Sequence, residues 1–301
     1  PGDTVIVAVG TYFEHVSFAG KQVVVQSSTP TDAAVVDATI IDGSGTGIAV
    51  TISGVGSGAV LNGFTIRNGN STTTTSSHGG GLDIQNASPQ ILNCIIRDNH
   101  TATDGGGIAI VGNSSPTIDG CTILSNTADG WGGGVYIFGD TSDPENVITA
   151  SPLLIRCRIS DNAATWDGGG IACFEACNVT IRNVLVDNND AGEVGGGIFV
   201  GYEATAVIQN VTVADNNALG STEGDATRVG RGGGMACWFG GATTCSSSIL
   251  WGNTAKNAEG NQISLEGFSQ ASTSYSAAQG GSAAVYVQND ANFTPPSPGG
   301  P

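Results

Sequence analysis

Apolar and mixed positions alternate strictly after six glycine triplets, which begin at Gly79, Gly105, Gly132, Gly168, Gly195 and Gly232. The first and third positions after each triplet are apolar or cysteine, in the pairs Leu82/Ile84, Ile108/Ile110, Val135/Ile137, Ile171/Cys173, Ile198/Val200 and Met235/Cys237. A period of two with one apolar face predicts a short, half-buried strand. The glycines before each strand supply a sharp corner that carries no side chain.

The same unit recurs along the chain, because successive triplets lie 26, 27, 36, 27 and 37 residues apart. Each unit holds a second predicted strand region, at 88–99, 115–126, 151–162, 178–189 and 206–217, with further variants at 59–69 and 246–253. Two or more strands per unit without an intervening helix exclude βαβ units, so equivalent strands must stack in parallel. The sequence predicts an all-β fold, a single right-handed parallel β-helix of roughly nine to ten coils.

Two columns of stacked side chains follow from this register. One runs through Phe64, Cys94, Cys121, Cys157, Asn183, Asn210 and Ser248; the other, five residues later, runs through Asn99, Asn126, Asn162, Asn188, Asp215 (with Asn216 beside it) and Asn253. An asparagine amide donates to one neighbour and accepts from another, so we expect an asparagine ladder. Cys94, Cys121 and Cys157 are expected to be small buried apolar residues rather than disulfides, since their side chains run side by side.

The sequence of the repeats resembles that of the secreted bacterial right-handed parallel β-helix repeat proteins. These are related to polymorphic outer-membrane-protein repeats and pectate-lyase-like β-helices. The resemblance rests on "PGDTVIV" at the start, on the "GGGI…SPTI…C.I..N.A" units and on "SSSILWGN" near the end. It implies a secreted or cell-surface location. In that family an amphipathic helix usually precedes the first corner, so we expect residues to be missing before Pro1. Members include surface proteins, adhesin-like proteins and polysaccharide lyases, and the fold alone does not choose among them.

The expected organisation is one body followed by a tail. Residues 1–291 form the β-helix, divided into N-terminal coils without a cap helix (1–69), glycine-triplet coils (79–253) and closing coils (254–291). Residues 292–301 read as a Pro/Gly linker to a further domain or anchor.

The net charge of the chain limits the classes of molecule that it can bind. The chain has 9 Lys and Arg against 26 Asp and Glu, a net charge of −17. Such a surface repels nucleic acid and anionic membranes, and no apolar run is long enough to span a bilayer. The glycine triplets lack the following helix and the Lys of a phosphate-binding loop.

Eight aromatic residues are expected on one outer face of the β-helix: Trp131, Tyr136, Phe138, Trp166, Phe174, Phe199, Tyr202 and Trp238. A continuous aromatic patch is suited to contact with other copies of the protein or with a glycan. The alternative is that the insertions at 139–150 or 220–229 fold over these rings. The unpaired strand edges at the two ends of a β-helix also allow end-to-end assembly.

The candidates for catalysis are Asp104, Asp167 and Arg231, which share one corner column in the order Asp104, Trp131, Asp167, Val194, Arg231. The two aspartates would lie two coils apart, about 10 Å, which is wide for a retaining glycosidase and marginal for an inverting one. Lyases of the resembled family hold calcium with clustered acids and use an Arg or Lys as the base. We expect no cofactor for a structural or adhesive module. If the protein is a lyase, we expect it to need calcium.

The cysteine and histidine residues indicate two possible disulfides and no zinc site. Cys173/Cys177 and Cys237/Cys245 could each close a small surface loop by a disulfide, which an exported protein would allow. A zinc site is not expected, because there is no CxxC pair and the three histidines are scattered. The sequence thus favours a non-enzymatic structural or adhesive module, with a polysaccharide lyase, hydrolase or carbohydrate-binding β-helix as the alternative.

Overall fold

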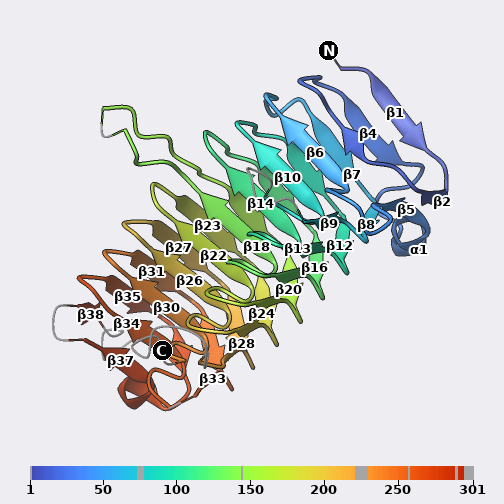
Figure 1. The fold of residues 1–301 in the computed structure, drawn as a ribbon. Coiled ribbons are helices and arrows are strands. Elements are labelled where there is room, and N and C mark those ends of the chain that lie inside the picture. Colours follow the sequence, from blue (N-terminus) through green and yellow to red (C-terminus); the bar gives the residue numbers. More distant parts are fainter. Residues whose placement is uncertain are drawn as a thin grey trace.

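The chain folds into a long stack of coils in which each strand pairs with its equivalents in the coils before and after (Figure 1). This computed structural model describes residues 2–72, 78–143, 145–220, 230–256, 258–288 and 291–294. Its strands form four parallel sheets, here called A to D, of 11, 10, 10 and 7 strands. A full coil runs through sheets A, B, D and C in that order. The predicted all-β parallel β-helix is confirmed.

The strand bounds follow the repeat. Sheet A contains β1 (Thr4–Val7), β4 (Val24–Ser27), β7 (Val60–Asn62), β11 (Gln90–Leu92), β15 (Thr117–Asp119), β19 (Leu153–Ile155), β23 (Asn178–Arg182), β27 (Thr205–Gln209), β31 (Ala242–Ser246), β35 (Gln270–Ser274) and β38 (Asn292–Thr294). Sheet B contains β2 (Gly10–Tyr12), β5 (Thr39–Asp42), β8 (Thr65–Arg67), β12 (Ile95–Arg97), β16 (Thr122–Leu124), β20 (Arg158–Ser160), β24 (Leu185–Asp187), β28 (Thr212–Ala214), β32 (Ile249–Trp251) and β36 (Ala277–Ala278).

The other two sheets complete each coil. Sheet C contains β3 (Val16–Ser17), β6 (Val50–Ser53), β10 (Leu82–Gln85), β14 (Ile108–Val111), β18 (Val135–Phe138), β22 (Ile171–Phe174), β26 (Ile198–Gly201), β30 (Met235–Trp238), β34 (Ile263–Leu265) and β37 (Val285–Val287). Sheet D contains β9 (Asn70–Ser71), β13 (His100–Thr101), β17 (Thr127–Ala128), β21 (Ala163–Ala164), β25 (Asp190–Ala191), β29 (Asn217–Ala218) and β33 (Thr254–Ala255).

Two short helices interrupt this pattern. The α-helix α1 (Ala33–Ala38) lies between β4 and β5 and packs against β5 and β8 at the side of the stack (Figure 1). The 3₁₀ helix η1 (Gly281–Ala284) precedes β37. The expected linker from residue 292 is wrong for its first residues, since Asn292–Thr294 form β38 and pair with β35. Residues 295–301 of that linker lie outside the described residues.

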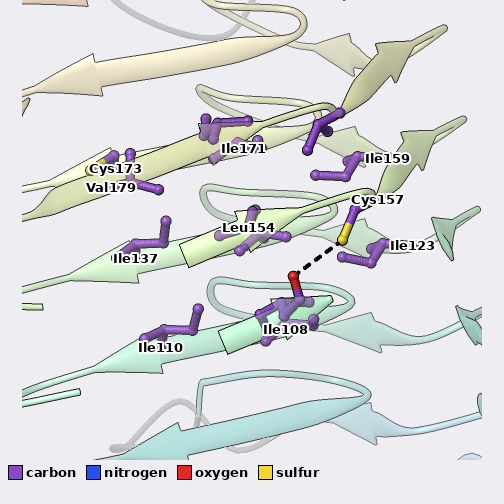
Figure 2. Close-up of a cluster of buried hydrophobic side chains, with 14 of the residues drawn as sticks. Ile108, Ile110, Ile123, Ile137, Leu154, Cys157, Ile159, Ile171, Cys173 and Val179 are labelled. Atoms are coloured by element: carbon purple, nitrogen blue, oxygen red, sulfur yellow. Dashed lines mark hydrogen bonds between the residues drawn. The ribbon is translucent and has the colours of Figure 1, made fainter. Parts of the chain in front are cut away.

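The core is the column of side chains that the alternation predicts. The first and third residues after each glycine triplet are all buried in one hydrophobic cluster, and they stack coil on coil, as in the series Ile84, Ile110, Ile137 and Cys173. Figure 2 shows Ile110, Ile137 and Cys173 of this series in the same interior as Leu154 of sheet A and Ile123 and Ile159 of sheet B. Three sheets therefore enclose one continuous apolar interior.

The glycine triplets are required by crowding between coils. Gly132 has a φ of +66°, which favours glycine. At Gly133 a Cβ atom would lie 2.4 Å from the carbonyl oxygen of Ala163 in the next coil. No side chain fits there without moving the backbone.

The asparagine ladder is confirmed for Asn99, Asn126 and Asn162, and it continues through Asn189, Asn216 and Asn253. Each of the first five donates from its side-chain amide to the Oδ1 of the next, over 2.9–3.0 Å. The prediction of Asn188 is wrong by one residue, because Asn188 is exposed and has a left-handed backbone with a φ of +55°.

The error lies in the column five residues earlier. Cys94, Cys121 and Cys157 are buried there as predicted, but Val184 and Val211 continue the column in place of Asn183 and Asn210. Asn183 and Asn210 instead have left-handed backbones at the preceding corner, a conformation that asparagine tolerates. Placing Asn183 and Asn210 in the cysteine column, and the ladder five residues after them, therefore shifted the predicted ladder by one residue in these coils.

Replacing Asn126 by alanine should lower the free energy of unfolding by on the order of 1–3 kcal/mol, because several buried groups lose their partner at once. Asn126 Nδ2 donates to the Ile96 carbonyl at 3.0 Å, and its Oδ1 accepts from the Asn99 backbone and amide. Urea unfolding measures the change. The exposed Asn113 is the control, and its replacement should cost under about 0.5 kcal/mol. Equal effects at both positions would contradict a stabilising ladder.

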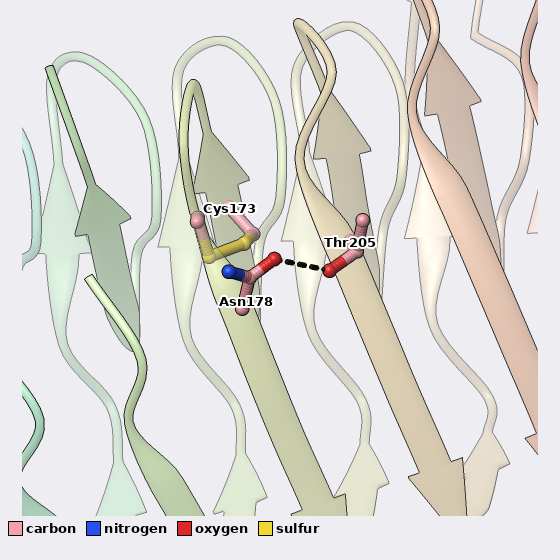
Figure 3. The surroundings of a disulfide bond; sticks show 4 residues. Cys173, Asn178 and Thr205 are labelled. Carbon is pink, nitrogen blue, oxygen red and sulfur yellow. Dashed lines mark hydrogen bonds between the residues drawn. A yellow bond between two sulfur atoms is a disulfide. The ribbon is translucent and has the colours of Figure 1, made fainter. Parts of the chain in front are cut away.

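The cysteines divide into one bridge and five thiols. Cys173 and Cys177 form a disulfide across the turn between β22 and β23, with their Cα atoms 6.1 Å apart (Figure 3). Next to it, the Thr205 hydroxyl donates to Asn178 Oδ1 at 2.6 Å. Cys237 and Cys245, the other proposed pair, are buried free thiols. The Cys94, Cys121 and Cys157 thiols also stay free, and each contacts backbone carbonyl oxygens; Figure 2 draws the bond from Cys157 to Ile118 O.

Candidate functional site

The predicted site residues lie on the outer face of sheet C and along the corner that leads into it. Backbone hydrogen bonds from Gly105 to Trp131, from Gly132 to Asp167 and from Gly195 to Arg231 fix the corner column in the expected order. The second and fourth residues of each sheet C strand point outward beside this column. The corner and the outer face of sheet C thus form one continuous surface.

Four of the eight aromatic side chains on this surface are buried, which corrects the expectation that they face water. Tyr136, Phe174, Phe199 and Trp238 are each 6% exposed or less and form a second apolar cluster with Ala172, Val194 and Ala236. Trp131, Phe138 and Tyr202 pack at its edge and are half-buried. Only Trp166 among the eight is exposed, at 41%. We therefore expect the triple replacement of Phe138, Phe174 and Trp238 by serine to destabilise the fold.

The exposed aromatic surface is a smaller platform at the corner. The rings of Trp131 and Trp166 meet edge to face with centroids 4.6 Å apart. Trp131 also stacks on Tyr136 at 6.5 Å, which links the platform to the buried cluster. This pair gives an apolar aromatic surface beside polar groups.

Asp104 and Asp167 hold this platform in place. The Trp131 backbone N–H donates to Asp104 Oδ1 at 2.9 Å, and its indole N–H donates to Asp167 Oδ2 at 3.2 Å. Asp167 Oδ1 also accepts from the Val194 backbone at 3.2 Å. The two carboxylates are therefore joined through a tryptophan.

Arg231, the third predicted catalytic residue, is directed toward the next coils. Its guanidinium donates to Glu259 at 2.6 Å and to Glu266 at 3.1 Å, and it lies 4.4 Å from the centre of the Tyr286 ring. These contacts satisfy its charge within the protein. The described contacts therefore do not assemble Asp104, Asp167 and Arg231 into one catalytic group.

A different polar group, which sequence reasoning missed, lies at the N-terminal end of the aromatic cluster. It consists of His78, Asp83, Asp104 and Tyr136 and is called the His78 cluster below. Asp83 on β10 and Tyr136 on β18 occupy the same outward column, separated by Ala109 on β14. The rings of His78 and Tyr136 meet with centroids 5.7 Å apart.

The carboxyl group of Asp83 is unusual for its environment. The residue is only 2% exposed, and burial raises its pKa to about 7 against the opposing effects of a hydrogen bond from Gln85 and the charge of His78. Burial also raises the pKa of the Tyr136 hydroxyl, and the nearby charges of Asp104 and Glu175 raise it further. Carboxyl groups whose pKa is strongly shifted by burial and by a charged neighbour are candidates for functional sites.

Two buried polar atoms of the cluster have no hydrogen-bond partner. Asp83 uses Oδ2 to accept from Gln85 at 2.7 Å, but its Oδ1 accepts no hydrogen bond. His78 Nδ1 lies 3.3 Å from Asp104 Oδ2, at an ion-pair distance but without the alignment of a hydrogen bond. Buried polar atoms are nearly always satisfied, so this pair is suited to a small polar ligand group.

One sequence signal pointed to this cluster. Asp83 is the only charged residue at the second position after a glycine triplet, where the other units have Ala109, Tyr136, Ala172, Phe199 and Ala236. His78 gave no such signal, because the fold and not the sequence spacing brings it next to Asp104 and Tyr136.

The described residues contain no group of three or more His, Cys, Asp or Glu side chains placed to hold a metal ion. Calcium binding is therefore expected only under the alternative that the protein is a lyase. No helix in the described part of the chain is long and apolar enough to cross a membrane.

Comparison with known proteins identifies the family to which the fold belongs. Residues 23–216 match the family model of the right-handed beta helix region. No curated protein matches the chain in sequence. Among solved structures, the alginate lyase from Paenibacillus sp. str. FPU-7 aligns with a TM-score of 0.52 at 13% identity, over 97% of this chain and 93% of the lyase.

A second solved structure, the pectin methylesterase from Yersinia enterocolitica, aligns with a TM-score of 0.42 at 8% identity, over 97% of this chain and 89% of the esterase. At these identities the likeness to both enzymes concerns the fold alone. The match over residues 23–216 decides the classification: the chain belongs to the right-handed β-helix family.

Proposed function

We propose that the chain is an extracellular or cell-surface polysaccharide-binding β-helix whose glycan site is the His78 cluster with the Trp131/Trp166 platform. The observation that carries the proposal is the pair of unpartnered buried atoms, Asp83 Oδ1 and His78 Nδ1. A sugar hydroxyl donates to a carboxylate and accepts from an imidazole N–H, so sugar hydroxyls suit atoms of both kinds. The tryptophan pair lies against the same cluster through Tyr136 and offers a ring surface to a sugar.

Three further observations support this proposal, and the first of them weighs against self-assembly through the aromatic face. Tyr136, Phe174, Phe199 and Trp238 are already covered within the chain, so a second copy would gain little from them. The fold relative with a TM-score of 0.52 is named as an alginate lyase, an enzyme of polysaccharides. The Cys173–Cys177 disulfide is in keeping with an oxidising compartment outside the cell.

Cleavage of the bound glycan is a second candidate function, favoured by the protonation of Asp83. A carboxyl group with a pKa of about 7 keeps its proton near neutral pH and can give it to a glycosidic oxygen. Asp104, whose Oδ2 lies beside His78, supplies a second carboxyl group at the same site. The pair has the composition that acid–base hydrolysis of a glycoside requires.

Retention of the protein on immobilised polysaccharides tests the proposed binding. We expect wild-type protein to be retarded by at least one polysaccharide, and His78→Ala to lose at least tenfold in affinity. Asp119→Asn on sheet A is the control, because Asp119 pairs with Arg156 away from sheet C. Equal retention of the His78→Ala variant, with circular dichroism unchanged in all three proteins, would refute this site. Release of reducing ends in the same samples tests cleavage.

A further inference from the structure

We propose that the glycan bound at the His78 cluster is a neutral polysaccharide, without carboxylates on the sugars that contact the protein. This inference rests on the proposed function and specifies its substrate class. It follows from the charges around the site.

The polar groups that a ligand would meet are mostly carboxyl groups. Asp83 has a buried oxygen without a hydrogen-bond partner, and Asp104 and Asp167 lie along the adjoining corner. Glu175, at the end of β22, also lies close enough to act on Tyr136. A uronate would place its own carboxylate among these groups, and above pH 7, where Asp83 has lost its proton, like charges at short range repel each other.

Positive charge that would offset this repulsion lies elsewhere in the described part of the chain. Arg231 is on the same surface but is bound to Glu259 and Glu266. Arg67, Arg97 and Arg158 are on sheet B, where each contacts an aspartate. Arg182 is on sheet A and donates to Gln209. His78 is thus the one basic side chain among the described members of the cluster, and its single imidazole faces two aspartates.

The groups present suit hydroxyl groups instead. Carboxylate oxygens accept hydrogen bonds from sugar hydroxyls, and the tryptophan pair contacts the apolar face of a sugar ring. A neutral polymer makes both contacts without bringing charge into the site. The net charge of −17 acts in the same direction at longer range.

Matched polymers that differ only in a carboxyl group test the inference. The probes are β-1,4-mannan against β-1,4-polymannuronate, and methyl-esterified against de-esterified polygalacturonate, at pH 8, where Asp83 is ionised, and at low and at high salt. We expect the neutral member of at least one pair to bind at least tenfold more tightly, with an affinity that salt leaves unchanged. Asp83→Asn should reduce this preference, and Asp119→Asn should leave it intact.

The outcomes separate the two proposals. Equal or tighter binding of the uronate polymers would overturn the substrate class and leave the glycan site standing. Absence of binding to every polymer in the panel would overturn both. A preference for neutral polymers that is unchanged in Asp83→Asn would show that the His78 cluster does not set it.

Discussion

Replacing Gly133 by alanine should prevent the β-helix from folding. The added Cβ atom would lie 2.4 Å from the carbonyl oxygen of Ala163, 2.5 Å from its carbonyl carbon and 2.7 Å from its nitrogen. All three are backbone atoms of the next coil, so no side-chain rotation relieves the overlap. Parting the coils would break the sheet hydrogen bonds on either side, and we expect a loss of more than about 4 kcal/mol.

Soluble expression and urea unfolding followed by circular dichroism measure this effect. Gly10→Ala is the matched control, because the nearest atoms to its added Cβ belong to the Tyr12 ring at 3.7 Å, an ordinary contact. It should change the free energy of unfolding by less than about 1 kcal/mol. A Gly133→Ala protein with wild-type stability would mean that the coils do not approach each other closely at the triplets.

Replacing Asp83 by asparagine should stabilise the protein at pH 8 by up to about 4 kcal/mol while it weakens glycan binding. The pKa of this carboxyl rises from its ordinary 3.8 to about 7 on folding. Each unit of difference corresponds to about 1.4 kcal/mol between the two protonation states. Stabilising changes at functional sites commonly cost activity, and this position is expected to follow that rule.

The direction of the Asp83 pKa shift defines the pH range over which Asp83 changes the stability of the protein. The folded protein holds the Asp83 proton more tightly than the unfolded chain, so the contribution of Asp83 to stability is greatest below pH 3.8. That contribution falls as the pH rises from 3.8 to about 7 and is constant above. The difference between wild type and Asp83→Asn should therefore be small at pH 3 and largest at pH 8. Urea midpoints that differ equally at both pH values would contradict a buried, protonated Asp83.

The architecture was accessible from sequence because it repeats. Six copies of one alternating pattern predicted the inward residues of sheet C, such as Ile110 and Ile137, and each copy supported the others. The predicted ladder was one residue early at Asn188 and at Asp215, because the following residue, Asn189 or Asn216, takes the buried position and the predicted one lies at the corner. The residue type alone does not decide between the corner and the buried ladder position, because asparagine suits both of them.

The candidate site was less accessible because it breaks the repeat. Asp104 and Asp167 were recognised as a column, but their role in holding Trp131 depends on side-chain directions that the column does not specify. Tyr136 was assigned to an exposed face, yet its neighbours on the adjacent coils cover it. His78 meets Asp104 and Tyr136 only through the stacking of three coils.

A crystal structure of the protein with a bound neutral oligosaccharide, taken from the polymer that it retains most strongly, tests the central claim most directly. The account predicts a sugar hydroxyl within hydrogen-bonding distance of Asp83 Oδ1 and His78 Nδ1, with a neighbouring sugar ring against Trp131 and Trp166. An oligosaccharide bound on another face, with the His78 cluster free of sugar, would contradict it.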